Sequence, residues 1–186
     1  AYVHPAILRL RVDPPSTEGA AWYEMFARSQ GTDPGRSATF AEMEARLPYV
    51  KDLGFDTIYL PPIHPIGRTK RKGRNNSLTS HPGEPGSPYA IGAWQDIGPR
   101  HGDGGHKAVE PGLGTLSECE RFIARCRGMG FAVAFDFALN CSPDHPYAKE
   151  HPDWFYREPD GSIRCAENPP KRYEDIYPLN FFCHDR

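Results

Sequence analysis

A helix-to-strand pattern that occurs twice is the feature that most constrains the fold of this chain. In the first copy, Thr39 and Glu42 have the spacing of a capping box, in which a hydroxyl and a carboxylate satisfy free amides at a helix start. Apolar residues then recur at helical spacing until Gly54, which ends the helix because glycine adopts the left-handed conformation without a Cβ clash. Residues 55–60 form an apolar run that stops at two prolines, which predicts a strand.

The second copy has the same order of signals. Thr115 and Glu118 form another capping box, Gly130 ends the predicted helix, and residues 131–139 (FAVAFDFAL) follow as the predicted strand. This run is almost continuously apolar, as expected for a strand of a parallel sheet that is covered on both faces. Two helix-to-strand units in succession indicate an α/β fold.

Two long loops follow the predicted strands, over residues 61–114 and from residue 140 onward. We expect one short strand near residues 89–91 and a hairpin around residues 159–161. Loops of this length are usually functional or disordered, and their tryptophans, tyrosines, histidines and asparagines argue against disorder. Enzymes with α/β barrels or open α/β sheets carry their sites at the carboxyl ends of strands, so we expect the site in these loops. Neither strand leads through a glycine-rich turn into a helix, which disfavours an open nucleotide-binding sheet.

Composition and charge exclude several classes of function. Hydrophobic residues make up 38% of the chain and the net charge is −2, which indicates a globular protein without a general attraction to nucleic acid or anionic membranes. No apolar run reaches the ~20 residues of a membrane span, and the start of the sequence lacks the pattern of a signal peptide. The 5 cysteines contain no CxxC pair, so we expect reduced thiols, a cytoplasmic protein and no metal site.

The loop after the first predicted strand carries a basic run over residues 68–74, followed by Asn75 and Asn76. Alone, such a run indicates a solvated face or a nucleic-acid patch. Together with two amide side chains and Gly73, which permits close backbone approach, it suits a polyhydroxylated or phosphorylated ligand.

Polar side chains also gather near the end of the second predicted strand. Asp136 lies inside the apolar run, so its carboxylate must be hydrogen-bonded, either for structure or as part of a site. Asn140 and His145 come just beyond the strand. The acidic residues farther along the loops, such as Asp144 and Asp175, are interpreted as loop structure.

Several segments resemble the α-1,4-glucan:maltose-1-phosphate maltosyltransferases of the α-amylase superfamily. The resemblance runs from about Ala21 to Phe181 and is most specific in four motifs: LPPIHPIGR, KGRNN, CSPDHP and AENPPK. It implies a partial (β/α)8 TIM barrel that holds about the first three strands, with long βα loops. Residues 1–20 would be a linker that enters the barrel, and residues 21–186 would be the N-terminal part of the catalytic domain, ending before the fourth strand.

The activity that the resemblance implies is transfer of maltose from maltose 1-phosphate to the non-reducing end of α-1,4-glucans such as glycogen, with release of phosphate. The anomeric configuration is retained through a covalent maltosyl-enzyme, without a metal or organic cofactor. The partners would be maltose 1-phosphate and the glucan acceptor, with no nucleic acid and no membrane, and the parent protein would be a homodimer.

The resemblance also implies a set of substrate-binding residues: Lys72, Asn76, Ser87, Asn140, Asn168, Lys171 and Tyr173. Lys72 and Asn76 would hold hydroxyls of the donor maltose, with Ser87 in the same pocket. Asn140 would lie beside the reacting sugar.

The remaining three residues of the set would surround the phosphate. Lys171 would stabilise negative charge on the leaving group, with Asn168 and Tyr173 beside it. The nucleophile and the acid/base that retaining enzymes need, carboxyl groups ~5–5.5 Å apart, follow the fourth and fifth strands in this family. No catalytic residue is therefore assigned, and we expect the isolated chain to be inactive.

Three departures from the family pattern leave other readings open. Asn140 replaces a glutamine and is followed by Cys141 where the wider superfamily has histidine, residues 94–103 look like an insertion, and Glu110 stands where histidine is expected. One alternative is an α-glucan hydrolase of the same superfamily, which Asn140 favours. Another is a non-catalytic, carbohydrate-binding truncation.

Overall fold

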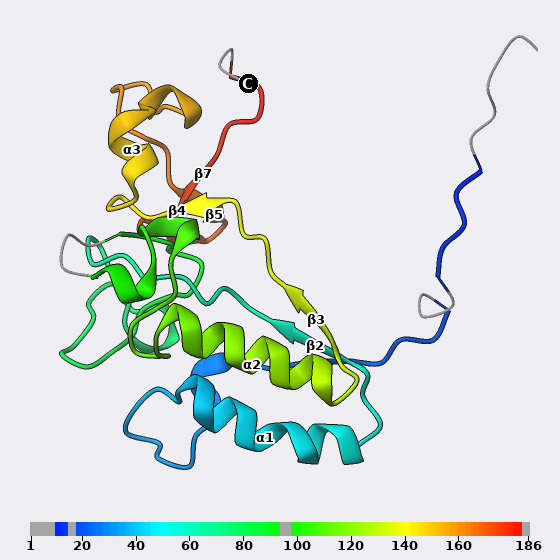
Figure 1. The fold of residues 1–186 in the computed structure, drawn as a ribbon. Coiled ribbons are helices and arrows are strands. Elements are labelled where there is room, and N and C mark those ends of the chain that lie inside the picture. Colours follow the sequence, from blue (N-terminus) through cyan, green and yellow to red (C-terminus); the bar gives the residue numbers. More distant parts are fainter. Residues whose placement is uncertain (1–9, 15–17, 94–97, 184–186) are drawn as a thin grey trace, which may run out of the picture.

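The centre of the molecule is a parallel sheet of three strands. The computed structural model describes residues 10–14, 18–93 and 98–183. In it, β1 (Trp22–Glu24), β2 (Thr57–Leu60) and β3 (Ala132–Phe135) lie in the order β1-β2-β3 (Figure 1). The register places Ile58 opposite Tyr23 on one side and Val133 on the other.

The strand predicted over residues 131–139 is wrong in length, because β3 ends at Phe135. Asp136 still donates its amide to the carbonyl of Leu60 at 2.9 Å, but β2 ends there and two prolines follow. Proline has no amide hydrogen to donate, so the chain beyond Asp136 has no neighbouring strand to pair with.

Both predicted capping boxes are confirmed. In α1 (Phe40–Asp52), the Glu42 carboxylate accepts from the Thr39 amide at 2.8 Å, and the Thr39 hydroxyl accepts from the Glu42 amide. In α2 (Leu116–Gly128), Thr115 and Glu118 repeat this arrangement. Both helices thus begin where the sequence predicts.

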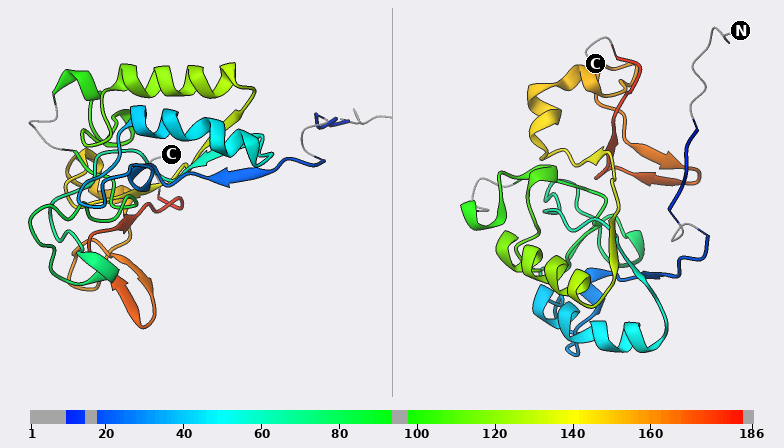
Figure 2. Two further views of the ribbon diagram at one scale, coloured as in Figure 1. Left: turned by 90° about the horizontal axis from the view of Figure 1, so that it is seen from below. Right: turned by 45° about the vertical axis from the view of Figure 1, so that its right-hand side comes forward.

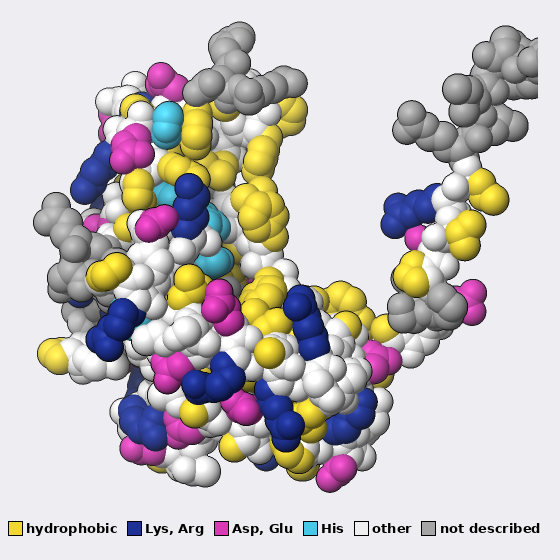
Figure 3. Space-filling view, in the orientation of Figure 1, with side chains coloured by type: hydrophobic (Ala, Val, Ile, Leu, Met, Phe, Trp, Pro, Cys, Tyr) yellow, Lys and Arg dark blue, Asp and Glu magenta, His cyan; other side chains and the backbone are white. Residues whose placement is uncertain are grey.

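The two helices cover one face of the sheet and form the main core with it. Figure 2 shows α1 and α2 side by side on the same side of the strands. Phe40 and Phe122 meet between the helices, with ring centroids 6.3 Å apart, and Ile58 and Leu60 point into the same cluster. The opposite face carries exposed aromatic rings, including Trp22, which is 57% exposed and lies 6.3 Å from the Tyr59 ring. Figure 3 shows hydrophobic side chains gathered along the hollowed side of the molecule.

The loops contain only short elements. After β1 comes η2 (Ala27–Ser29), and after β2 come η3 (Arg74–Asn76), η4 (Pro99–His101) and η5 (Gly105–Lys107). The strand expected near residues 89–91 is reduced to one isolated bridge between Ile66 and Ile91. Residues 94–97 of the expected insertion lie outside the described residues.

The chain after β3 folds back over the carboxyl ends of the strands. Its elements are β4 (Asn140–Cys141), α3 (Pro146–Glu150), η6 (Pro152–Trp154), β5 (Ala166–Asn168), β6 (Lys171–Tyr173) and β7 (Tyr177–Pro178). β4 pairs with β7, and β5 pairs with β6 across a turn that contains the cis peptide Pro169–Pro170. The hairpin expected around residues 159–161 is a turn closed by the isolated bridge between Arg157 and Ile163.

No described helix has the length and apolar character needed to cross a membrane. The four buried cysteines, Cys119, Cys126, Cys141 and Cys165, form no disulfide. Burial raises the pKa of Cys119 to about 11 and the pKa values of Cys126 and Cys141 to about 12, so these thiols behave as apolar packing groups.

Candidate functional site

The loops after β2 and β3 form a cavity of about 540 Å³ that is open to solvent. Its wall is made by Lys72, Gly73, Asn76, Gly86, Ser87, Tyr89, Asn140, Ala166, Tyr173 and Ile176. Five of the seven residues predicted to bind substrate therefore line one cavity: Lys72, Asn76, Ser87, Asn140 and Tyr173. The wall combines amide, hydroxyl and ammonium groups with aromatic rings, which are the groups that suit a sugar.

The other two predicted residues do not line this cavity. Asn168 and Lys171 face each other in register at the tip of the β5–β6 hairpin, and both are exposed. Tyr173 at the other end of β6 does reach the cavity wall. The hairpin therefore connects the cavity to an exposed tip, and a phosphate-binding role for Asn168 and Lys171 stays a prediction.

Backbone conformation explains how Lys72 and Asn76 reach the same wall. Asn75 and Asn76 both adopt left-handed backbone conformations, with φ of 54° and 63°, which asparagine tolerates better than most residues. A Cβ atom on Gly73 would collide with the carbonyl oxygen of Thr79. The sequence KGRNN thus forms a tight reversal that turns its first and last side chains to one side.

Asp136 is both structural and close to the cavity. The Tyr59 hydroxyl donates to Asp136 Oδ2 at 2.9 Å, and this hydrogen bond is the main cause that raises the pKa of Tyr59. Burial, with a contribution from Asp136, raises the pKa of the cavity residue Tyr89 to about 12. The half-buried Asp136 carboxylate thus has a hydroxyl partner on β2 and acts on a tyrosine of the wall.

Several wall residues, among them Tyr89 and Ile176, were not predicted from the sequence. Asp175 lies in a loop, as predicted, but the structure buries it to 1% exposure beside Ile176. Hydrophobic periodicity in the run EDIYPLNF does not distinguish a buried loop aspartate from an exposed one.

Backbone carbonyl groups anchor the loop that carries Lys72, Asn76 and Ser87. Arg71 donates to the carbonyl of Ile66 at 2.7 Å and to that of Gly67 at 2.8 Å. Arg28, which follows β1, donates twice to the carbonyl of Gly86 at 3.1 Å. These hydrogen bonds therefore fix the loop at two points, before Lys72 at Ile66 and Gly67, and just before Ser87 at Gly86.

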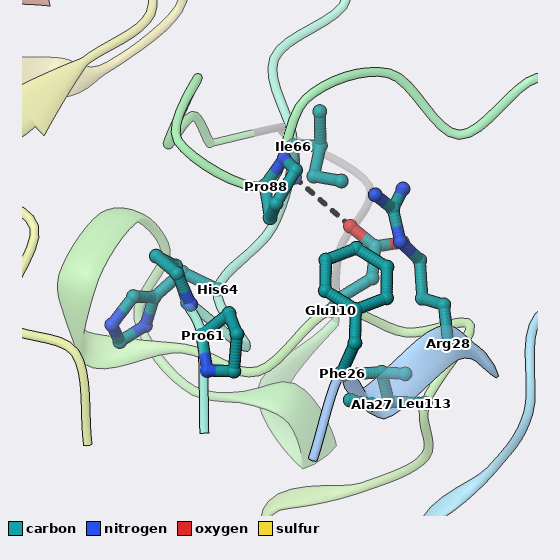
Figure 4. A pocket seen from close by; sticks show the side chains of 10 residues that line it. Phe26, Ala27, Arg28, Pro61, His64, Ile66, Pro88, Glu110 and Leu113 are labelled. Atoms are coloured by element: carbon teal, nitrogen blue, oxygen red, sulfur yellow. Dashed lines mark hydrogen bonds between the residues drawn. The ribbon is translucent and has the colours of Figure 1, made fainter. Parts of the chain in front are cut away.

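Glu110 completes this anchor from the following loop. Its carboxylate accepts from the Ile66 amide at 2.9 Å, and Figure 4 shows Glu110, Ile66 and Arg28 pointing toward one another. Burial raises the pKa of Glu110, while the Ile66 and Gly112 amides and the charges of Arg71 and Arg28 oppose that rise. The glutamate found in place of the expected histidine thus has defined partners.

Replacing Glu110 by alanine is expected to lower the free energy of unfolding by about 1–3 kcal/mol, because the change removes the acceptor of the buried Ile66 amide. Glu110→Gln keeps an acceptor oxygen and should cost clearly less. The check is urea unfolding of both variants, with the exposed Glu120→Ala as the matched control. Equal effects of the alanine and glutamine variants would contradict the assignment.

Three histidines from the loops after β2 and β3 lie next to one another. His106 and His145 are 3.1 Å apart between Nδ1 and Nε2, and the His64 ring lies 5.4 Å from the His106 ring. The Tyr147 amide donates to His145 Nδ1, so His145 Nε2 carries the proton that it donates to His106. Only glycine fits beneath this pair, since a Cβ on Gly105 would collide with the His145 ring.

These rings form contacts with each other and with backbone oxygens. His106 Nε2 lies 2.8 Å from the carbonyl of Ala138, and His64 Nδ1 lies 2.9 Å from that of Ala108. Among the residues that the structure describes, no group of three or more histidine, cysteine, aspartate or glutamate side chains is arranged to hold a metal ion. The histidine row, defined by His64, His106 and His145, connects the loops after β2 and β3 through these contacts.

Comparison with known proteins agrees with this geometry. A protein from Rhodospirillum rubrum named α-1,4-glucan:maltose-1-phosphate maltosyltransferase is 55% identical over 175 residues, which are 94% of this chain and 24% of that protein. A protein of the same name from Chlorobaculum tepidum is 49% identical over 185 residues, which are 100% of this chain and 26% of that protein. The chain is homologous to part of these maltosyltransferases. It spans about a quarter of the length of the curated relatives that it matches, and no protein-family model matches it.

Solved structures give the same relationship at the level of fold. The crystal structure of an α-amylase from Lactobacillus plantarum matches with a TM-score of 0.66 and 31% identity, covering 87% of this chain and 32% of that chain. A maltogenic α-amylase from Thermotoga neapolitana matches with a TM-score of 0.63 and 26% identity, with the same shares covered. The maltosyltransferase homology and the α-amylase fold therefore point to one superfamily.

Proposed function

We propose that this chain is the donor-binding front part of a maltosyltransferase that moves maltose from maltose 1-phosphate to the non-reducing end of α-1,4-glucans and releases phosphate. The observation that carries the proposal is the cavity at the strand ends, where five residues of the predicted set converge from separate loops. The homology of the chain to maltosyltransferases supports the choice of substrate.

The sheet supports a place at the start of a (β/α)8 barrel. Such a barrel repeats a strand followed by a helix, with all helices on the outer face, and the three parallel strands with both connecting helices on one face follow this pattern. The face that carries Trp22 and Tyr59 would then point to the barrel interior. Residues 1–20 would lead into the barrel, and residues 21–186 would form its N-terminal part.

Within this proposal, the predicted residues divide between the sugar and the phosphate. Lys72 and Asn76 would donate to sugar hydroxyls, and Asn140 would lie beside the reacting carbon. Lys171 and Asn168 would hold the phosphate at the hairpin tip, where a cation stabilises the negative leaving group. The two carboxyl groups of the retaining mechanism would come from a later part of the parent protein, so this chain alone would not catalyse the reaction.

The reaction would need no metal or organic cofactor, because departure of phosphate depends on charge stabilisation and a carboxylate nucleophile. The proposed setting is a cytoplasmic homodimer that builds α-glucans.

The test is phosphate release by the full-length protein, given maltose 1-phosphate and a short maltooligosaccharide. Phosphate release coupled to acceptor growth by two glucose units is the expected result. Release of free sugar without growth would favour the α-glucan hydrolase, the alternative to which Asn140 and the α-amylase likeness lend support. A folded protein that binds maltooligosaccharides without releasing phosphate or sugar would favour a non-catalytic binding role.

A further inference from the structure

Asp175 is a buried carboxylate without a matching hydrogen-bond donor. It lies in the loop between β6 and β7 and is 1% exposed. Among the described residues, neither of its carboxylate oxygens has a hydrogen-bond partner. A buried, unpaired carboxylate is costly, and aspartate is almost never fully buried unless it is paired. A carboxylate buried at this place therefore needs an opposite charge nearby to offset the cost of its burial.

Lys72 supplies the positive charge that offsets the buried carboxylate. This lysine is only 3% exposed, which is rare for a cation, and it lines the cavity. Burial raises the pKa of the Asp175 carboxyl, its own backbone amide and Lys72 oppose the rise, and Glu174 adds to it. The positive charge of Lys72 thus favours the ionised form of the buried carboxylate, without a hydrogen bond between the two groups.

The two residues come from different walls of the cavity. Lys72 belongs to the loop after β2, whereas Asp175 follows Tyr173 and precedes Ile176, both of which line the cavity. At the low effective dielectric of a buried site, opposite charges attract more strongly than on the surface. The pair therefore links the two loops at the point where the cavity wall contains an ammonium group.

We propose that Asp175 is a positioning residue that holds the Lys72 side chain in the cavity wall and thereby sets the affinity of the cavity for a phosphorylated sugar. The proposal rests on the proposed function for its ligand, and on the buried pair for its mechanism. Without Asp175, Lys72 becomes a buried cation without a counter-charge, and its side chain is expected to turn toward solvent. The ligand then loses a donor that was already in place.

A double-mutant cycle separates this role from simple packing. The variants are Asp175→Asn, which keeps the shape and removes the charge, Lys72→Met, which keeps most of the length and removes the cation, and the combination. Calorimetry on the full-length protein measures binding of maltose 1-phosphate. We expect Asp175→Asn to weaken binding about tenfold when Lys72 is present and less than about twofold when it is methionine. Equal weakening in both backgrounds, or none in either, would overturn the proposal.

Two further variants sharpen the cycle. Asp175→Glu retains the negative charge and should recover part of the affinity that Asp175→Asn loses. Glu174→Gln removes the neighbouring, half-buried carboxylate and should leave the affinity within about twofold of the original protein. An Asp175→Glu variant no better than Asp175→Asn, or a Glu174→Gln variant as weak as it, would count against the pair.

Stability measurements keep this proposal separate from the proposed function. If the full-length protein does not bind maltose 1-phosphate at all, the function fails, and urea unfolding of the same four proteins still tests the pair. We expect the loss of unfolding free energy caused by Asp175→Asn to shrink by at least about half in the Lys72→Met background. An undiminished loss would overturn the proposal whatever the ligand is.

Discussion

Replacing Lys171 by alanine is expected to lower turnover of maltose 1-phosphate by the full-length protein roughly 10²–10³-fold. The physical reason is loss of the cation that would stabilise negative charge on the departing phosphate. Lys171 is exposed at the hairpin tip, where packing contributes little, so the free energy of unfolding should change by less than about 0.5 kcal/mol. Phosphate release and thermal unfolding, measured on the same preparation, check both parts.

The control for Lys171 is Lys149→Ala, which removes an exposed lysine of α3 that does not line the cavity. Its turnover should match that of the original protein. A marked fall in melting temperature of Lys171→Ala with unchanged phosphate release would show that the hairpin tip is structural and that another group meets the phosphate.

Acid is expected to destabilise the protein through the histidine row. Burial is the main cause that lowers the pKa of His145 from 6.5 to about 4, and the neighbouring His106 and His64 contribute. Between these two pH values the unfolded chain binds a proton at this residue and the folded chain does not. The free energy of unfolding should therefore fall as pH drops through this window, by up to about 3 kcal/mol for the shift of His145.

The measurement is urea unfolding at a series of pH values between 7 and about 4. His145→Asn keeps a capping side chain at the start of α3 and removes the titrating ring, so its stability should vary less with pH. His81→Asn is the matched control, because it removes a histidine from the exposed surface instead of from the buried row. Equal changes of slope in the two variants would refute the role of His145.

Local signals predicted the helices well, because they depend on residues close in sequence. Thr39 with Glu42 and Thr115 with Glu118 marked both helix starts at the residues where the structure has them. The predicted length of β3 was wrong, because the length of a strand depends on its pairing partner. That partner, β2, ends at Leu60, and no local property of residues 136–139 reveals this.

The candidate site, too, could be predicted only in those features that do not depend on distant contacts. Asn140 and Asn76 could be selected from motif resemblance, and the structure brings them to one cavity with three other predicted residues. Burial of Asp175 beside Lys72 could not be predicted, because it depends on how two loops about a hundred residues apart fold together. The position of Asn168 and Lys171 outside the cavity likewise follows from where the β5–β6 hairpin points.

The anchors of the cavity loops have a consequence for how this sequence can vary over evolutionary time. Arg71, Arg28 and His106 bind the carbonyl groups of their partners, not the partners' side chains. Every amino acid has such a carbonyl, so the bond itself sets no requirement on the side chain at Ala138. Gly67 and Gly86 also receive such bonds, but a Cβ atom there would collide with Ser142 and Arg71, so these two positions need glycine for another reason. The donating side chains have no such freedom. Related proteins should therefore keep the donors and the two glycines, and should vary more at a receiving position such as Ala138, so that the shape of the cavity is conserved more strongly than the sequence around it.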